Sequence, residues 1–352
     1  MRIKSLDGIR AVAIGLVLAT HIFGFRWGWI GVDLFFVLSG FLITGILRKE
    51  RHSASYWKPF YIKRATRILP PLVIAFLGAG FLYHLPWRHY GVLYIFFGAN
   101  IGEYLVRGHF ASLGVLWSLA VEEHFYFFWP IAVRLLSRRR LIHLSVAIIF
   151  AEPLLRAVVT PYTHSFWFIF FLTPFRLDGL VMGSLLGVLM EDAEWTKRYQ
   201  SWSTPALLLT TGSFIPLCFY PAFDRVANTV LFNSIGYSLI SLIGLFLVFA
   251  ATERESAVTA ILSNPLLAFV GLISYGLYLY HPLVITLVDR FGTAIHFHHN
   301  RVLSPLTLAG SILLAWVSYR IYEQPIMRWG HQKARQVKIE KELDAATSLA
   351  SS

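Results

Sequence analysis

Repeated apolar segments of about 20 residues constrain this chain most, because a helix of that length spans the hydrocarbon core of a bilayer. Such segments recur along most of the 352 residues. They lie near 6–25, 30–47, 68–84, 117–137, 141–158, 166–190, 204–221, 230–250, 265–287 and 304–322. The composition agrees, since only 14% of the residues are charged, whereas soluble domains carry about a quarter. The sequence therefore predicts an all-α polytopic membrane protein with about ten transmembrane helices.

The distribution of Lys and Arg predicts how these helices cross the membrane. Cytoplasmic loops carry an excess of these residues, so the basic linker 48–67 and the triple arginine 138–140 should both be cytoplasmic. Two apolar segments already lie between them, and a third crossing would place the triple arginine outside. We therefore expect the short polar-interrupted stretch 90–106 to be re-entrant or interfacial, and both termini to be cytoplasmic. Few cations, among them Arg156 and Arg225, fall in the outer loops and their flanks.

The remaining composition excludes several classes of protein. Lys and Arg number 31 against 19 Asp and Glu, and orientation in the membrane explains this excess better than binding to nucleic acid. Cys218 is the single cysteine, so neither an intrachain disulfide nor a cysteine metal site can form. We expect one membrane domain over residues 1–330 and a polar, disordered cytoplasmic tail over residues 331–352.

Arg10 and His21 stand eleven residues apart in the first apolar segment. In an α-helix this spacing places the two side chains within about 20° of each other and roughly 16 Å apart along the axis. One helix face would then carry a permanent cation and, nearer the outer surface, a buried titratable base. Ionisable residues inside a membrane are costly and mark functional sites by default. A signal peptide is disfavoured, because no small-residue cleavage site follows.

Other polar residues fall into two tiers of membrane depth. The outer or central tier mixes base and acid, and consists of His21, Asp33, Glu122 and His281. The inner tier is cationic, and consists of Arg10, Arg64 and Arg67. Purely structural explanations stay open for these residues. Asp33 could lie at the lipid–water boundary, and His281 could be a packing residue before a proline. Arg64 and Arg67 could serve only to orient the chain in the membrane.

The two tiers suit a transferase with an anionic donor. A neutral histidine that a carboxylate orients is a general base for an alcohol or amine. Arginines beneath it would bind donor phosphates through their planar forks. Acyl-coenzyme A fits this outline, and its long arm is comparable in reach to the rise between Arg10 and His21. Other anionic donors stay open. A metal is not expected, because the histidines of the HFHH run (His296, His298, His299) have no carboxylate close in sequence.

Seven motifs resemble those of the integral-membrane acyltransferase family 3, whose members O-acylate carbohydrates and other small acceptors. In chain order they are SLDGIRAVAIGLVLATH, GVDLFFVLSGFLIT, YIKRATRILP, LWSLAVEEHFYFFWP, FRLDGLVMGSLLG, SYGLYLYHP and SYRIYEQP. Two positions depart from the family pattern, because His124 stands where glutamine is common and Tyr280 where tryptophan is common.

The resemblance implies transfer of an acyl group, usually acetyl, from coenzyme A to a hydroxyl. It implies that Arg10 and His21 form the family's essential pair. Arg64 and Arg67 match the family's conserved arginine pair, and Glu122 matches the first glutamate of its S-L-x-V-E signature. The expected site residues fall into three groups: catalytic His21, Glu122 and Asp33; donor-binding Arg10, Arg64 and Arg67; substrate-binding Arg176, Tyr278 and His281. We expect no metal.

The acceptor stays open at this stage. A cell-surface or lipid-linked carbohydrate at a bacterial inner membrane is the main expectation, and the chain's own loops would select it. A small hydrophobic acceptor such as an antibiotic or a lipid would use the same site. A transporter of anionic substrates is a third alternative, disfavoured because no internal repeat is visible.

Overall fold

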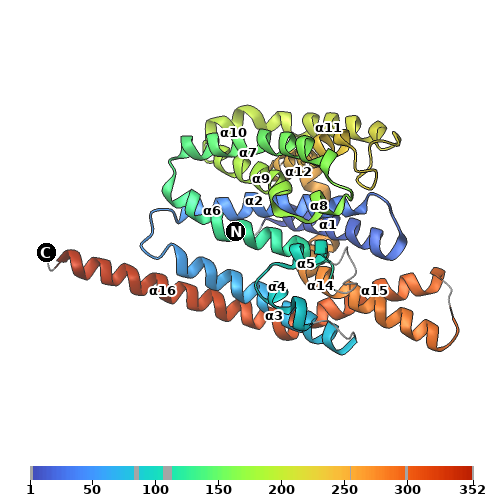
Figure 1. Ribbon diagram of the computed structural model, residues 1–352. Coiled ribbons are helices and arrows are strands. Elements are labelled where there is room, and N and C mark those ends of the chain that lie inside the picture. Colours follow the sequence, from blue (N-terminus) through green and yellow to red (C-terminus); the bar gives the residue numbers. More distant parts are fainter. Residues whose placement is uncertain (1–2, 83–86, 106–112, 254, 298–299, 351–352) are drawn as a thin grey trace. The chain divides into compact units, whose positions relative to one another are not determined.

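The computed structural model describes residues 3–82, 87–105, 113–253, 255–297 and 300–350 (Figure 1). Every regular element in these ranges is a helix. Within them, seven helical segments are long and apolar enough to cross a membrane. They are Lys4–Phe23, Gly28–Lys49, Trp57–Leu82, Arg138–Tyr162, Phe232–Thr252, Pro265–Ala294 and Val302–Glu342. The predicted all-α membrane class is confirmed, whereas the predicted count of ten spans is not.

The chain divides into two compact units, one formed by residues 1–45 and 86–274 and the other by residues 46–85 and 275–352. The helices that lie wholly or mainly in the first unit are α1 (Lys4–Phe23), η1 (Gly28–Ile30), α2 (Gly31–Lys49), α4 (Trp87–Ile95), α5 (Ala99–Leu105), α6 (Leu116–Leu135), α7 (Arg138–Val159), η2 (Thr160–Tyr162), α8 (Trp167–Phe171), η3 (Thr173–Phe175), α9 (Leu177–Leu189), α10 (Ala193–Tyr199), η4 (Gln200–Trp202), α11 (Ser203–Leu217), η5 (Phe232–Gly236), α12 (Tyr237–Thr252) and α13 (Ala257–Leu262). The other helices are α3 (Trp57–Leu82), α14 (Pro265–Ala294), α15 (Asn300–Ser318), η6 (Tyr319–Glu323) and α16 (Gln324–Ala350).

The predicted span 166–190 is broken rather than continuous. It forms the short helix α8, the 3-10 turn η3 and the helix α9, with extended backbone at Leu172 (ψ 133°). Pro174 explains much of the break, because it has no N–H to donate to the carbonyl four residues earlier and its ring would clash there. The break places Arg176 at the start of α9, inside the first unit.

Two further predicted spans also differ from single apolar helices that cross a membrane. The helix α6 has the expected length of 20 residues but carries Glu122, Glu123 and Arg134. The helix α11 has only 15 residues and ends at Leu217. Neither belongs to the seven candidate spans.

The stretch 90–106 forms two short helices, α4 and α5, which part at Phe97, where φ is positive (57°). Neither helix has the length of about 20 residues that a crossing needs. The Asn100 amide donates to the Thr173 hydroxyl (3.0 Å), and the Tyr94 hydroxyl donates to the Glu103 carboxylate (2.6 Å). These two bonds satisfy the Asn100 amide nitrogen and one Glu103 oxygen, whereas Asn100 Oδ1 and Glu103 Oε2 are buried without a hydrogen-bond partner among the described residues. The re-entrant or interfacial placement of this stretch stays a prediction.

The core of the first unit joins α1, α2, α9 and α12. Its buried side chains include Leu6, Ile9, Val37, Leu38, Leu186, Val248 and Phe249. Glycines let α2 and α9 approach closely, because a Cβ atom at Gly40 would collide with the Leu180 carbonyl, and one at Gly183 with the Val37 carbonyl. Small residues permit such contacts between membrane helices. This contact fixes the register of the two helices that carry Asp33 and Arg176.

In the second unit, α16 runs along α3 (Figure 1, red along blue). Gly330 packs directly on Thr66, and Lys338 forms an ion pair with Glu50 (2.9 Å). The tail expected to be disordered from residue 331 is therefore helical to Ala350, and Ala334 and Val337 are buried. Contact with a neighbouring helix stabilises a helix whose own sequence is too polar to do so.

Candidate functional site

Arg10 and His21 lie on the same helix, α1, as the spacing predicts. Arg10 is held in place, because its Nη1 donates to the Asp7 carboxylate one turn earlier (2.5 Å) and Asp7 is buried. His21 lies in the last turn of α1, which ends at Gly24 with φ of +72°. The imidazole is exposed, whereas we expected a buried base. It is therefore open to a substrate that approaches the end of α1.

Asp33 and Arg176 form an ion pair inside the first unit. Arg176 Nη2 donates to Asp33 Oδ1 at 2.7 Å, and both side chains are at most 3% exposed. Asp33 is therefore enclosed by the protein itself, whatever its depth in the membrane. Aromatic rings enclose the guanidinium; those with centroids within 6 Å of its carbon belong to Phe36, Trp117, Phe170 and Tyr237. Such enclosure stabilises a cation away from water.

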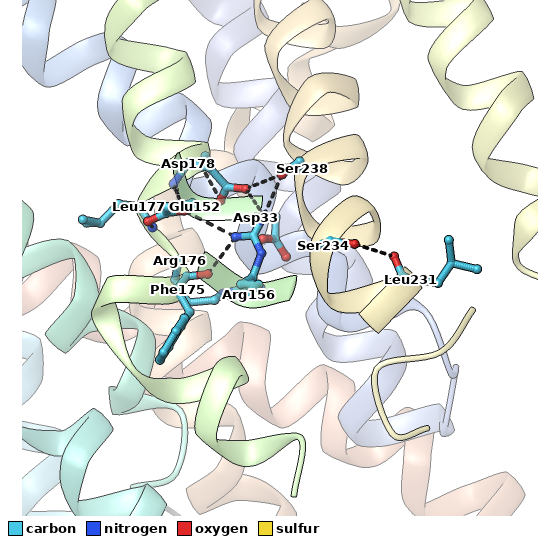
Figure 2. A network of polar contacts seen from close by, with 11 residues as sticks. Asp33, Glu152, Arg156, Phe175, Arg176, Leu177, Asp178, Leu231, Ser234 and Ser238 are labelled. Carbon is cyan, nitrogen blue, oxygen red and sulfur yellow. Dashed lines mark hydrogen bonds and ion pairs between the residues drawn. The ribbon is translucent and has the colours of Figure 1, made fainter. Parts of the chain in front are cut away.

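A second buried arginine, Arg156, forms the centre of a polar network that was not predicted from the sequence (Figure 2). Its Nη2 donates to Asp178 Oδ2 (2.8 Å) and to the Ser238 hydroxyl (2.6 Å), and its Nη1 donates to the Phe175 carbonyl (2.9 Å). Ser238 donates in turn to the same Asp178 oxygen (2.9 Å). Arg156, in the last turn of α7, thus joins α7, α9 and α12.

Glu152 completes this network by capping α9 (Figure 2). Its two carboxylate oxygens accept from the backbone N–H groups of Leu177 (2.8 Å) and Asp178 (2.7 Å). The first N–H groups of a helix lack partners within the helix, so a carboxylate at this end stabilises it. Arg156 Nη1 also donates to Glu152 (3.3 Å), which balances the carboxylate charge. The network therefore fixes the turn before α9 that presents Arg176 to Asp33.

A sequence signal for this network does exist. Glu152 and Arg156 are four residues apart in an otherwise apolar segment, which is the spacing of a helical ion pair. The motif FRLDG then supplies Arg176 and Asp178 two residues apart. Reading these charges together, rather than assigning Arg156 to a loop flank, predicts a compensated cluster at membrane depth.

Glu122 on α6 contacts a neighbouring helix. Its Oε1 accepts from the Ser39 hydroxyl of α2 (2.9 Å), and its Oε2 accepts from the Tyr126 hydroxyl (2.9 Å). Each carboxylate oxygen of Glu122 therefore accepts a hydrogen bond from a hydroxyl group. The pairing of Glu122 with His21 stays a prediction.

The predicted site residues of the second unit include His281, Tyr278 and Arg67. His281 is buried, and its Nδ1 lies 3.0 Å from the Leu277 carbonyl of the same helix. A carbonyl only accepts, so Nδ1 carries the proton and Nε2 carries the lone pair of the neutral ring. The Tyr278 ring lies beside it, with centroids 6.2 Å apart. Arg67 is exposed on α3.

Arg64 lies one helical turn before Arg67 on α3 and is half-buried. The buried carboxylate of Glu323 is the charged neighbour of Arg67. Glu323 also accepts from the Ser318 hydroxyl (2.8 Å). The predicted donor-binding and substrate-binding roles in this unit stay predictions.

No group of three or more His, Cys, Asp or Glu that could hold a metal occurs among the described residues. His298 and His299 of the HFHH run lie outside those residues. The absence of a metal stays a prediction.

Comparisons with known proteins agree with the motifs. A protein of Staphylococcus aureus (strain COL), which bears the name "Putative O-acetyltransferase", is 30% identical over 93% of this chain and 58% of its own length. The peptidoglycan O-acetyltransferase OatA of Listeria monocytogenes is 28% identical over 93% of this chain and 56% of its own length. A Bacillus subtilis protein, YrhL, named for the same activity, is 28% identical over 96% of this chain. No solved structure matches.

The chain spans a little more than half the length of these curated relatives. The family model described as an acyltransferase domain matches residues 3–320, which include every predicted site residue. The chain therefore belongs to the integral-membrane acyltransferase family 3.

Proposed function

We propose that the chain is a membrane-embedded O-acyltransferase, which moves an acyl group, in the simplest case acetyl, from acyl-coenzyme A to a carbohydrate hydroxyl. Family membership over residues 3–320 supports acyl transfer. The names of two relatives point to peptidoglycan as the acceptor, or to its lipid-linked precursor. The site would lie in a bacterial inner membrane, with both chain ends in the cytoplasm.

The arrangement of α1 is the observation that carries this proposal. It holds a fixed arginine near one end and an exposed histidine at the other. In the proposed reaction, His21 takes the proton of the acceptor hydroxyl as that oxygen attacks the thioester carbon. The coenzyme A thiolate then leaves and takes the proton from the imidazolium. Arg10, Arg64 and Arg67 bind the anionic donor.

Purified protein in lipid nanodiscs, supplied with acetyl-coenzyme A and a lipid-linked disaccharide, tests the proposal. Free thiol and ester-linked acetate should rise together and only when both substrates are present. A transporter would release no thiol. Transfer to a lipid or an antibiotic, without transfer to the carbohydrate, would contradict the acceptor but not the acyl transfer.

Replacing the α3 arginines should weaken donor binding more than the chemical step. A lost charge-assisted bond to phosphate costs about 1.5–3 kcal/mol, so Arg64→Ala and Arg67→Ala should each raise the donor KM more than about tenfold. Steady-state kinetics with acetyl-coenzyme A measure this. The control is Arg328→Ala, an exposed cation on α16. An unchanged donor KM with a collapsed kcat would contradict the donor role.

Glu122→Gln should lower kcat by about 10²-fold if this carboxylate supports the base, and Glu123→Gln should lower it much less. Glu122 holds two hydroxyl donors, one on each oxygen, and a glutamine offers only one oxygen. The neighbouring Glu123 points about 100° away around the helix. Equal losses of kcat in the two variants would contradict a specific role of Glu122 in supporting the base.

A further inference from the structure

Arg225, in the segment between α11 and η5, lies against a cluster of aromatic rings in the first unit. Its guanidinium carbon is 4.6 Å from the centroid of Phe170, 4.9 Å from that of Trp29 and 5.6 Å from that of Phe166. Aromatic rings attract the cation but offer no oxygen acceptor. The guanidinium N–H groups therefore remain available for hydrogen bonds to another group.

No hydrogen bond or ion pair joins the Arg225 side chain to another residue in the described parts of the chain. The adjacent carboxylate of Asp224 is already engaged, by the Arg26 side chain and by the Val226 backbone N–H (2.7 Å). Burial lowers the pKa of Arg225 below its usual value, although a guanidinium still keeps its proton. The carboxylates of Asp224 and Asp33 act on this half-buried cation from nearby, but neither accepts a hydrogen bond from it in the described parts of the chain. Leaving buried N–H groups without acceptors is costly, and an oxygen anion would satisfy them through charge-assisted hydrogen bonds.

Packing places this cation beside the end of α1. Gly28 packs on the Leu16 carbonyl and on the side chain of Thr20, the residue directly before His21. Trp29 follows Gly28 and supports the Arg225 guanidinium. The ion pair between Arg26 and Asp224 joins the same two segments a second time. Arg225 is, accordingly, the charged neighbour that acts on the His21 imidazole.

We propose that Arg225 is a substrate-contacting residue that binds an oxygen anion of the substrate beside His21. This proposal rests on the acyl transfer proposed above. Two sources of such an anion share the same chemistry. When the acceptor oxygen attacks the thioester carbon, the carbonyl electron pair moves to its oxygen, and this oxyanion could accept from Arg225. Alternatively, the anion is a carboxylate or phosphate of the acceptor itself.

The oxyanion decays without further reagents. Its electron pair re-forms the carbonyl, the carbon–sulfur bond breaks, and the thiolate takes the proton that His21 received from the acceptor hydroxyl. If the Arg225 guanidinium binds the oxyanion, its loss should lower kcat. If it binds an acidic group of the acceptor, its loss should raise the acceptor KM.

The test compares Arg225→Gln and Arg225→Lys with the wild type, with thiol release followed at varied concentrations of acetyl-coenzyme A and of acceptor. The matched control is Arg198→Gln, because Arg198 also lies against an aromatic ring (5.5 Å from the Tyr199 centroid) but on α10. A thermal unfolding scan of each variant shows whether it is folded. Because Arg225→Gln could lose the aromatic support, Arg225→Ala with sub-denaturing guanidinium added to the assay gives a second readout.

Oxyanion binding predicts a loss of about 10²–10³-fold in kcat for Arg225→Gln, with both KM values nearly unchanged. Binding of an acidic acceptor predicts a rise of roughly 10- to 150-fold in the acceptor KM, and the loss should vanish with a neutral acceptor. Either result, with rescue of Arg225→Ala by guanidinium, supports the proposal. Activity of a folded Arg225→Gln variant equal to that of Arg198→Gln overturns it, and so does a loss that guanidinium does not rescue. A wild-type protein that releases no thiol overturns the proposed function as well.

Discussion

His21→Ala should lower acetyl transfer by about 10²–10⁴-fold, which is the usual contribution of a general base. The imidazole lies exposed in the last turn of α1. Its removal therefore leaves no cavity in the core, and the variant should insert and fold normally. Thiol release from acetyl-coenzyme A and ester-linked acetate on the acceptor both measure the loss.

The matched control is His143→Ala, because His143 is also an exposed histidine on an apolar helix of the first unit. This variant should transfer acetyl at the wild-type rate. Normal turnover by a folded His21→Ala variant would remove the basis for the catalytic assignment, whatever the results for the arginines.

Arg156→Met should lower the stability of the fold severely. Removal of one partner from a buried ion pair costs about 3–5 kcal/mol, because the other charge is left uncompensated. Here two carboxylates, Glu152 and Asp178, would lose their shared cation. Thermal unfolding in detergent should detect the change directly. Activity should fall too, because the turn that presents Arg176 to Asp33 would loosen.

The control for this prediction is Arg139→Met, on the same helix but exposed, which should change stability little. The double variant Arg156→Met/Asp178→Asn should regain part of the lost stability, because one uncompensated carboxylate has been removed. Wild-type stability in Arg156→Met would show that the network contributes little to the fold.

The sequence predicts the class of this fold well, because a bilayer permits few alternatives to helices with satisfied backbones. Seven of the predicted segments overlap the seven candidate spans among the described residues. Length and hydropathy are less successful elsewhere. They fail at residues 166–190, where mean hydropathy is high and Pro174 nevertheless breaks the helix. The break has a local cause, because hydropathy does not register that proline lacks an N–H. The helix after residue 331 has a tertiary one, because a polar segment is stabilised there by packing on α3.

The site was predictable only in part. Regular helix geometry places Arg10 and His21 on one helix from their spacing alone. The partner of Asp33 could not be read in this way, because Arg176 is 143 residues away and only the tertiary fold joins them. Arg156 and Arg225 were both classified by their position near loops. One is the buried centre of a network, and the other is a cation enclosed by aromatic rings.

Two of the buried ion pairs of the first unit, Arg156–Glu152 and Arg176–Asp33, differ in how they can enter the membrane during synthesis. Glu152 and Arg156 belong to one helix, four residues apart, so Arg156 enters the membrane together with its counter-ion. Asp33 enters the bilayer with α2 long before Arg176 leaves the ribosome. Folding of this unit is therefore ordered by synthesis. The Asp33 carboxyl group stays without its counter-ion until Arg176, just before α9, has been synthesised and inserted.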